Sequence, residues 1–578
     1  MPPALSRGGI GARLDIDRLQ QTIVVVAVLL PLLLFVVVPL WSLLRLSFET
    51  PGGYGLDNYA RYFASAKFGR IVGNSFAVAT TATLITIVLA YAFAYSLQRA
   101  AIRWRAGFAA VALLPLYAPS LVQALGILFL FGRNGIVNRT FGSGIDLYGF
   151  WGIVIADVLY SFPHAFLILT AALAHADARL YESARMLGAG SARVFRTVTL
   201  PGTRYGVISA AFVVFTIVIT DFGNPVVIGG DYGVLATEIY NQVSGQGNMA
   251  LGAVVGVVLL VPAALAVLVE RWITRHSHAA LGERSQPLSI EPEAWRDRIA
   301  FLFCSVVALA IAAVVAVVAI ASVITLWPYN MHFSLRHYRF DVQNGLAPLW
   351  TSVVVSLMAA AIGVVVTLAA AAMARTLRPV SAQLLHFLSI LPAAVPGMVL
   401  GLGYILTFND PRNPLEVLYG TLLILAICNV YHYHAQGFLI AGTALRQVST
   451  VFDEASTCLG AGFLRTLRSV LLPIIAPAIV SIGVFFFVRS MVTLSAVIFL
   501  VTPATQLAAV SVLLLDDAGN QNQAAAYSIC IMAIVALALA ALHATLALLR
   551  RWRQPHDHVP VPARVRADDS PGMAGVSP

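Results

Sequence analysis

Lysine is almost missing from this sequence of 578 residues, and charged residues as a whole are scarce. Lys67 is the only lysine, and Asp, Glu, Lys and Arg together make up 11% of the chain. A phosphate-binding loop of the Walker type ends in Gly-Lys-Ser or Gly-Lys-Thr, whereas Lys67 stands in Ala66-Lys67-Phe68. The sequence therefore excludes an ATPase of this kind within the chain.

Apolar residues take the place of the missing charge. They make up 59% of the chain, whereas soluble domains are roughly half apolar and a quarter charged. A hydrocarbon core of ~30 Å is crossed by about 20 helical residues, and runs of this length occur twelve times. We therefore expect an all-α polytopic membrane protein with about twelve transmembrane helices. The runs lie near residues 22–46, 71–97, 108–131, 150–174, 204–229, 250–270, 299–327, 349–374, 384–408, 416–441, 474–501 and 524–549.

The net charge of +10 has an explanation in this topology. With the N-terminus in the cytosol, 26 of the 36 basic residues fall in cytosolic loops and tails, and eight fall outside. This asymmetry is the positive-inside rule, so we expect no nucleic-acid partner. The four cysteines lie in spans or on the cytosolic side, which predicts no outer disulfide. They are Cys304, Cys428, Cys458 and Cys530.

One polar stretch occurs twice, 272 residues apart, between long apolar runs. Each copy has a Glu with two small residues, then a Gly, then Leu-Pro, and carries arginines. We expect both copies to be loops at the membrane surface, in which a helix is broken by glycine, Ser191 caps a second short helix and Pro201 closes it off from the next span. The copies comprise Glu182, Ser183, Ala184, Gly188, Leu200 and Pro201, and then Glu454, Ala455, Ser456, Gly460, Leu472 and Pro473.

The repeat extends beyond these loops. Leu114-Pro115, Pro119 and Gly126 match Leu391-Pro392, Pro396 and Gly403 at a spacing of 277. Six spans in each half leave both halves in one orientation, which predicts parallel repeats about an axis along the membrane normal. We expect a first half over 1–270, a cytosolic linker over 271–298, a second half over 299–550 and a disordered cytosolic tail over 551–578.

The duplicated stretch, within loops 176–203 and 448–475, resembles the EAA loop of importer-type ABC transporter permeases. The resemblance implies that both loops dock on a separate ATPase subunit, in two copies, and that an outer solute-binding protein delivers the cargo. Glu182 and Glu454 would anchor their loops to neighbouring arginines or to that partner, or they only cap and solubilise their helices. The coupling residues implied are Glu182, Ala184, Gly188, Leu200, Pro201, Glu454, Ala455, Gly460, Leu472 and Pro473.

Two further stretches are similar to fused permeases for 2-aminoethylphosphonate and for ferric iron. They are residues 220–231 with 236–241 and residues 493–503 with 516–519. This resemblance implies a multi-pass inner (plasma) membrane permease with both termini in the cytosol. We favour 2-aminoethylphosphonate as cargo, with ferric iron and then thiamine as alternatives. We expect no catalytic residue, no cofactor and no resident metal.

Several residues within the spans are candidates for the translocation path. Pro115, Pro119, Pro392 and Pro396 interrupt helices at membrane depth, either to line a cavity or to improve packing. Ionisable groups in spans are costly and usually face a bundle interior or a cavity, and Asp221 and Arg489 form a candidate pair, as a gate or as a salt bridge between the halves. The polar residues are Asp157, His164, Asp221, Asn224, Asn429, His432, His434, Gln436 and Arg489.

Two other classes of membrane protein fit part of the pattern. A secondary transporter of the major-facilitator type also has twelve spans in two parallel halves, and a channel or scaffold would have many spans as well. Neither gives a role to the duplicated loops. His432 and His434 are two residues apart and diverge on a helix, which argues against a metal site.

Overall fold

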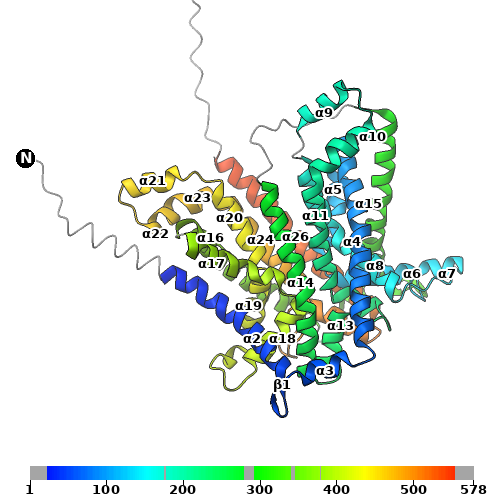
Figure 1. Ribbon diagram of the computed structural model, residues 1–578. Helices are drawn as coiled ribbons and strands as arrows, with labels where there is room; N and C mark the ends of the chain where they lie inside the picture. Colours follow the sequence, from blue (N-terminus) through cyan, green and yellow to red (C-terminus); the bar gives the residue numbers. More distant parts are fainter. Residues whose placement is uncertain (1–22, 175–176, 279–291, 340–344, 378, 554–578) are drawn as a thin grey trace, which may run out of the picture.

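The computed structural model describes residues 23–174, 177–278, 292–339, 345–377 and 379–553 (Figure 1). These residues form a helical bundle, and the strands within them belong to two short hairpins, β1-β2 and β3-β4. The predicted class of all-α polytopic membrane protein is confirmed. Residues 1–22 of the N-terminal tail, 279–291 of the expected linker and 554–578 of the C-terminal tail lie outside the described residues.

The first half consists of six spans with short helices between them. Its elements are η1 (Leu33–Val37), α2 (Val38–Phe48), β1 (Glu49–Thr50), β2 (Gly53–Tyr54), α3 (Asp57–Phe63), α4 (Phe68–Arg99), α5 (Arg105–Ala112), η2 (Leu114–Tyr117), α6 (Ser120–Phe131), α7 (Ile136–Phe141), α8 (Phe150–Ala174), α9 (Ala178–Met186), α10 (Ser191–Val194), η3 (Phe195–Thr199), α11 (Leu200–Ile219), α12 (Gly223–Ile228), α13 (Leu235–Tyr240), η4 (Asn241–Gly245) and α14 (Met249–His278).

The second half repeats this order. Its elements are α15 (Ala294–Ser322), β3 (Ile324–Leu326), β4 (Asn330–Phe333), η5 (Arg336–Arg339), α16 (Ala347–Thr376), α17 (Pro379–Ile390), η6 (Leu391–Ala394), α18 (Gly397–Phe408), η7 (Glu416–Leu418), α19 (Leu422–His432), α20 (His434–Arg446), α21 (Val451–Cys458), α22 (Phe463–Thr466), η8 (Leu467–Leu471), α23 (Leu472–Ile474), α24 (Ala476–Val492), α25 (Ala508–Asp517) and α26 (Gln521–Arg553).

The twelve expected spans correspond to nine long apolar helices and three bent helix pairs of the described chain. The bends are 105° between the ninth-span helices, 59° at Tyr433 and 81° at Ile475. Two expected spans begin and end earlier than predicted, because the fifth covers Ser191–Ile219 and the bent pair of the eleventh runs from Phe463 to Val492. Helix α14 runs on to His278, so the first part of the expected linker is helical.

The repeat also includes the face opposite the two motif loops, where Figure 1 shows β1 and α3. The first helix of each half leads into a hairpin, and a serine of its last turn bonds a tyrosine that follows the hairpin. The hydroxyl groups of Ser47 and Tyr59 are 2.8 Å apart, and those of Ser322 and Tyr338 are also 2.8 Å apart. The same hydroxyl pair therefore fixes the first helix to its outer segment twice.

The two halves exchange their first helices. Helix α2 packs on α18 of the second half, and α15 packs on α6 of the first half. A Cβ atom added at Gly126 in α6 would lie 2.6 Å from the Val314 carbonyl oxygen of α15, and one at Gly403 in α18 would lie 2.7 Å from the Pro39 oxygen of α2. The matched glycines seen in the sequence therefore allow close contact between helices of opposite halves.

Candidate functional site

The two motif loops have the same backbone path. Helices α9 and α21 end at Gly188 (φ 75°) and Gly460 (φ 70°), both left-handed. The residue after each glycine donates its N–H to a carbonyl in the last helical turn, at 3.0 Å in the first loop and 2.9 Å in the second. Glycine adopts this conformation without strain, so the motif glycine is required by the turn. Space is not the constraint, because nothing lies within 4 Å of a Cβ built at either position.

The segment after each turn corrects two details of the expected loop. Gly190 is the N-cap residue of α10, and Ser191 is its first helical residue, without a side-chain cap. Helices α10, η3 and α11 form one continuous span, Ser191–Ile219, so Leu200 and Pro201 lie inside it and Pro201 does not close a helix off. In the second loop, Leu472 and Pro473 form α23 and the chain bends just after them.

Both loops lie on one face of the molecule, with α9 and α10 at one side and α21 to α23 at the other (Figure 1). The side chains of Glu182 and Glu454 are exposed. Within the described residues neither carboxylate has an ion-pair partner, so the expected anchoring to a neighbouring arginine is not formed. Large apolar side chains beside them are also exposed, with Met186 89%, Leu187 85% and Leu459 87% accessible. Ala184 is half-buried and Ala455 is exposed on the same short helices.

The four prolines stand at equivalent helix breaks. Pro115 and Pro392 lie in the 3-10 turns η2 and η6, and Pro119 and Pro396 are the N-cap residues of α6 and α18. The next helices are buried over most of their surface, including Ser120 to Phe129 and Gly397 to Tyr404. The predicted interruptions are therefore present, and they place α6 and α18 inside the bundle.

A buried polar cluster joins α8 to the break after α11. The Asn224 side-chain amide donates to Asp157 Oδ1 at 2.8 Å, and the Asn224 backbone N–H donates to Asp221 Oδ2 at 2.9 Å. Asp221 thus caps the first turn of α12, at the end of the fifth span. Asp157 Oδ2 and Asn224 Oδ1 are buried and accept no hydrogen bond from a donor group of the described chain, and the Asp157 and Asp221 carboxyl groups lie within hydrogen-bonding reach of each other. This half therefore gathers two carboxyl groups and an amide oxygen in one buried cluster.

The corresponding region of the second half is built differently. Asn429 donates to the Ser490 hydroxyl at 2.8 Å, and the hydroxyls of Tyr433 and Thr493 are 2.8 Å apart. The Arg489 guanidinium lies 4.7 Å from the centre of the Tyr433 ring and interacts with Tyr160 of the first half. Arg489 therefore meets aromatic side chains from both halves.

The expected pairing of Asp221 with Arg489 is not formed. Across the described ranges no ion pair links them, since Asp221 is engaged by backbone N–H groups and Arg489 by tyrosines. Sequence analysis missed Tyr160 and Tyr433, because tyrosine is common in apolar helices. The only feature of the sequence that could have indicated these tyrosines is their position near ionisable residues in the fourth span of each half.

The histidines do not assemble into a metal site. His432 ends α19 and His434 begins α20, on either side of a bend. Among the residues whose structure is described, no group of three or more His, Cys, Asp or Glu side chains could hold a metal ion.

At the hairpin end of the bundle, α25 ends in a pair of carboxylates, Asp516 and Asp517. Burial raises the pKa of Asp516 to about 6, and the neighbouring charge of Asp517 acts in the same direction. The Gln521 side chain donates to Asp516 at 3.2 Å and partly offsets this effect. Asp516 is therefore a group that titrates in the mildly acidic range.

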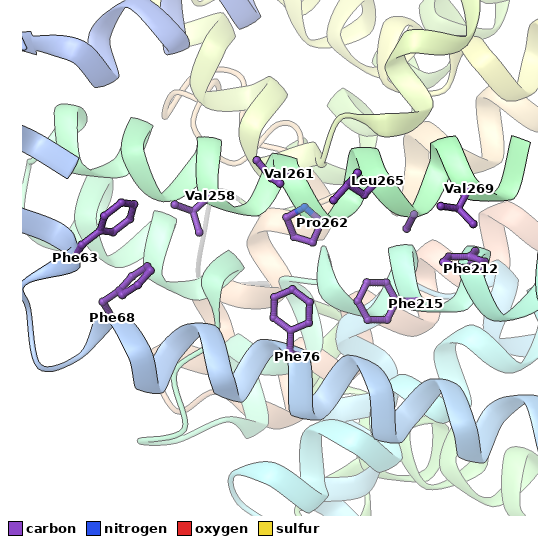
Figure 2. A pocket seen from close by; sticks show the side chains of 11 residues that line it. Phe63, Phe68, Phe76, Phe212, Phe215, Val258, Val261, Pro262, Leu265 and Val269 are labelled. Atoms are coloured by element: carbon purple, nitrogen blue, oxygen red, sulfur yellow. The ribbon is translucent and has the colours of Figure 1, made fainter. Parts of the chain in front are cut away.

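A separate groove of about 480 Å³ runs along the outside of the bundle between α4, α11 and α14 (Figure 2). Its lining is almost wholly apolar, with Phe76, Phe215 and Pro262 near its middle. It contains none of the polar cluster residues. This groove is a lipid-facing surface of the bundle and does not belong to the candidate path.

Nine long apolar helices and three bent pairs, with a pair of matched loops on one face, are the arrangement expected of a polytopic transport protein. Residues 87–278 match the family described as "Binding-protein-dependent transport system inner membrane component". The chain belongs to this family of ABC importer permeases, which reside in the inner membrane, and the predicted family is confirmed.

Two relatives and one solved structure illustrate the similarity. The "Ferric transport system permease protein FbpB" of Actinobacillus pleuropneumoniae is 29% identical over 89% of this chain and 76% of its own. The "Putative ferric transport system permease-like protein AfuB" of Escherichia coli is 43% identical over 16% of this chain and 77% of its own. A bacterial ABC transporter involved in alginate import is 17% identical, with a TM-score of 0.39, over 47% of this chain and 99% of its own.

Proposed function

We propose that this permease imports ferric iron, with both halves of the translocation path in one chain. The observation that carries the proposal is the long alignment with a relative named for ferric transport, which extends over 89% of the chain. A second relative of similar name is 43% identical over a shorter stretch. The preference for 2-aminoethylphosphonate has no such support, and we replace it with ferric iron.

The buried polar cluster is compatible with this cargo. Ferric iron is a hard cation that prefers oxygen ligands, and Asp157, Asp221 and Asn224 gather buried oxygen atoms in one cluster. A zwitterionic phosphonate would suit a vestibule with both acidic and basic groups, such as Asp221 and Arg489. Within the described chain the structure shows no ion pair between these two residues, and Arg489 lies against Tyr433.

We propose that the path is lined by this cluster and by the broken helices of both halves. Helices α6 and α18 start at proline breaks and are buried, as expected for irregular backbone that is tolerated only inside the protein or beside a water-filled cavity. The residues assigned to the path are Pro115, Pro119, Asp221, Asn224, Pro392, Pro396 and Arg489.

The energy for import has to come from a separate ATPase, for which we propose the two motif loops as docking sites. Their exposed apolar side chains and free carboxylates are suited to a protein partner, because exposed apolar patches rimmed by charge mark interaction surfaces. This assignment puts the loops and both termini in the cytosol. The hairpin face would then receive a solute-binding protein, and two ATPase copies would serve the two loops.

The deciding experiment is growth of a strain that lacks this gene. We expect poor growth under iron limitation and normal growth on 2-aminoethylphosphonate as sole phosphorus source, with restoration by the wild-type gene. An Asp157→Asn variant, checked for normal membrane abundance, should restore growth less well than a Ser65→Ala control outside the cluster. If the strain that lacks the gene grows normally under iron limitation but fails to grow on the phosphonate, the phosphonate is the cargo.

A further inference from the structure

An arginine from the second span of each half binds the end of the span that leads into its own motif loop. Arg99, in the last turn of α4, donates to the Leu173 carbonyl at 3.0 Å. Arg375, in the last turn of α16, donates to the Leu445 carbonyl at 2.5 Å. The two leucines are counterparts in the repeat, 272 residues apart. The two arginines are 276 residues apart, one fewer than the spacing of 277 between matched residues in this part of the repeat. The same arginine–carbonyl contact is thus made from positions that are not exact counterparts, which indicates that the fold requires this contact.

The remaining contacts of the two arginines differ in chemistry. The Arg99 guanidinium lies 5.1 Å from the centre of the Tyr181 ring, and the Tyr181 hydroxyl donates to Thr199 at 3.0 Å. Arg375 forms an ion pair with Asp453 at 2.6 Å and donates to the Val448 carbonyl at 3.1 Å. Tyr181 and Asp453 are counterparts, and each directly precedes the motif glutamate.

We propose that Arg99 and Arg375 are positioning residues that fasten the two coupling loops to the transmembrane helices, by an aromatic contact in the first half and by an ionic contact in the second. Isolated helices of nine and eight residues, the lengths of α9 and α21, are not stable in water. Their orientation must come from tertiary contacts. A force applied to either loop by a docked partner therefore passes through an arginine to α4 or α16. The coupling part of this inference rests on the proposed ATPase docking.

The fastening is tested by hydrogen exchange of the full-length permease in lipid nanodiscs. Arg375→Ala should speed exchange in residues 451–458 by about tenfold or more, as expected for loss of hydrogen bonds from a charged donor, and leave 178–186 unchanged. Arg99→Ala should do the reverse. Asp453→Asn removes only the ion pair and should speed exchange in 451–458 roughly two- to fivefold. Arg103→Ala, an exposed arginine on the same face, is the matched control.

Salt provides an independent check on the difference between the loops. Rising ionic strength screens ion pairs, so exchange in 451–458 of the wild type should rise while 178–186 stays level. Equal changes in both loops, or no change in either variant, would overturn the fastening.

The coupling role has its own readout, the stimulation of ATP hydrolysis by cargo-loaded binding protein in the reconstituted complex. Arg375→Ala should reduce this stimulation severalfold at unchanged complex yield, and Arg375→Lys should restore part of it. Faster exchange with undiminished stimulation would overturn the coupling role. Iron uptake by the wild-type complex tests the proposed cargo separately, so the two failures can be told apart.

Discussion

At the scale of single residues, one contact between a glycine and a serine occurs in both halves, with the positions of the two residues interchanged. A Cβ atom built at Gly223 would lie 2.0 Å from the Ser120 hydroxyl, and one built at Gly397 would lie 2.3 Å from the Ser495 hydroxyl. Ser120 corresponds to Gly397 in the repeat, and Gly223 corresponds to Ser495. Each contact therefore holds one serine and one glycine, and their positions are interchanged between the two halves.

This exchange predicts a rescue. Gly223→Ser alone should overfill the contact and destabilise the protein by about 1–3 kcal/mol, whereas the double variant Gly223→Ser with Ser120→Gly should return towards wild-type stability. Thermal unfolding in detergent measures both. Gly69→Ser is the control, because no atom lies within 4 Å of a Cβ there. A double variant as unstable as the single one would contradict the prediction.

Asp516 predicts a dependence of stability on pH. Its folded pKa, raised by burial to about 6, exceeds the ordinary value near 3.9, so the native state binds the proton more tightly than the unfolded chain. Its contribution is present below pH 4 and is lost as pH rises through 6. Because Asp516 is partly exposed, the loss should be about 1–2 kcal/mol. Unfolding between pH 4 and 7 should show this slope, and Asp516→Asn should reduce it.

At the scale of elements, the turns of the two motif loops depend on their glycines. Valine at Gly188 or Gly460 would have to adopt a left-handed conformation that costs about 1–3 kcal/mol. We expect each variant to reach the membrane but to transport less and to retain less ATPase on purification. Gly190→Val is the matched control, since Gly190 lies in the same loop with an ordinary φ of −69°. If both variants transport normally, the prediction is wrong and the two glycines are not required for transport.

The elements also show what a sequence can and cannot predict. Hydropathy located the spans, and the duplicated motif located the two turns, because each span and each copy of the motif is encoded in residues close together in the chain. The end of α11 before Asp221 and the bend at Ile475 were missed, since apolar composition continues across both breaks. The contacts of Arg99 and Arg375 were missed for another reason, because their partners lie 74 and 70 residues away.

At the scale of the whole molecule, orientation is the expectation that can be tested most directly. Cysteines engineered near Gly55 and Gly519 should react with an impermeant reagent added from outside, because both lie on the hairpin side. Cysteines near Gly190 and Gly462 should react only after the membrane is opened. The four native cysteines have to be replaced beforehand, and Cys458 is exposed. Labelling of either loop from outside would show that the orientation is the opposite of the expected one, and it would contradict the proposal that the loops dock on a cytosolic ATPase.

The exchanged first helices have a consequence for the time course of synthesis. Pro39 of α2 leaves the ribosome long before Gly403, the residue it packs on. At about 5–20 residues per second, the interval between them is roughly 20–70 s. The neighbour of α2 in its own half, α14, is made only when about half of the chain has been synthesised, and until α18 follows, the α18-facing side of α2 lacks its partner. The nascent protein therefore passes through a long-lived, incompletely packed intermediate in the membrane, at which membrane chaperones and proteases can act.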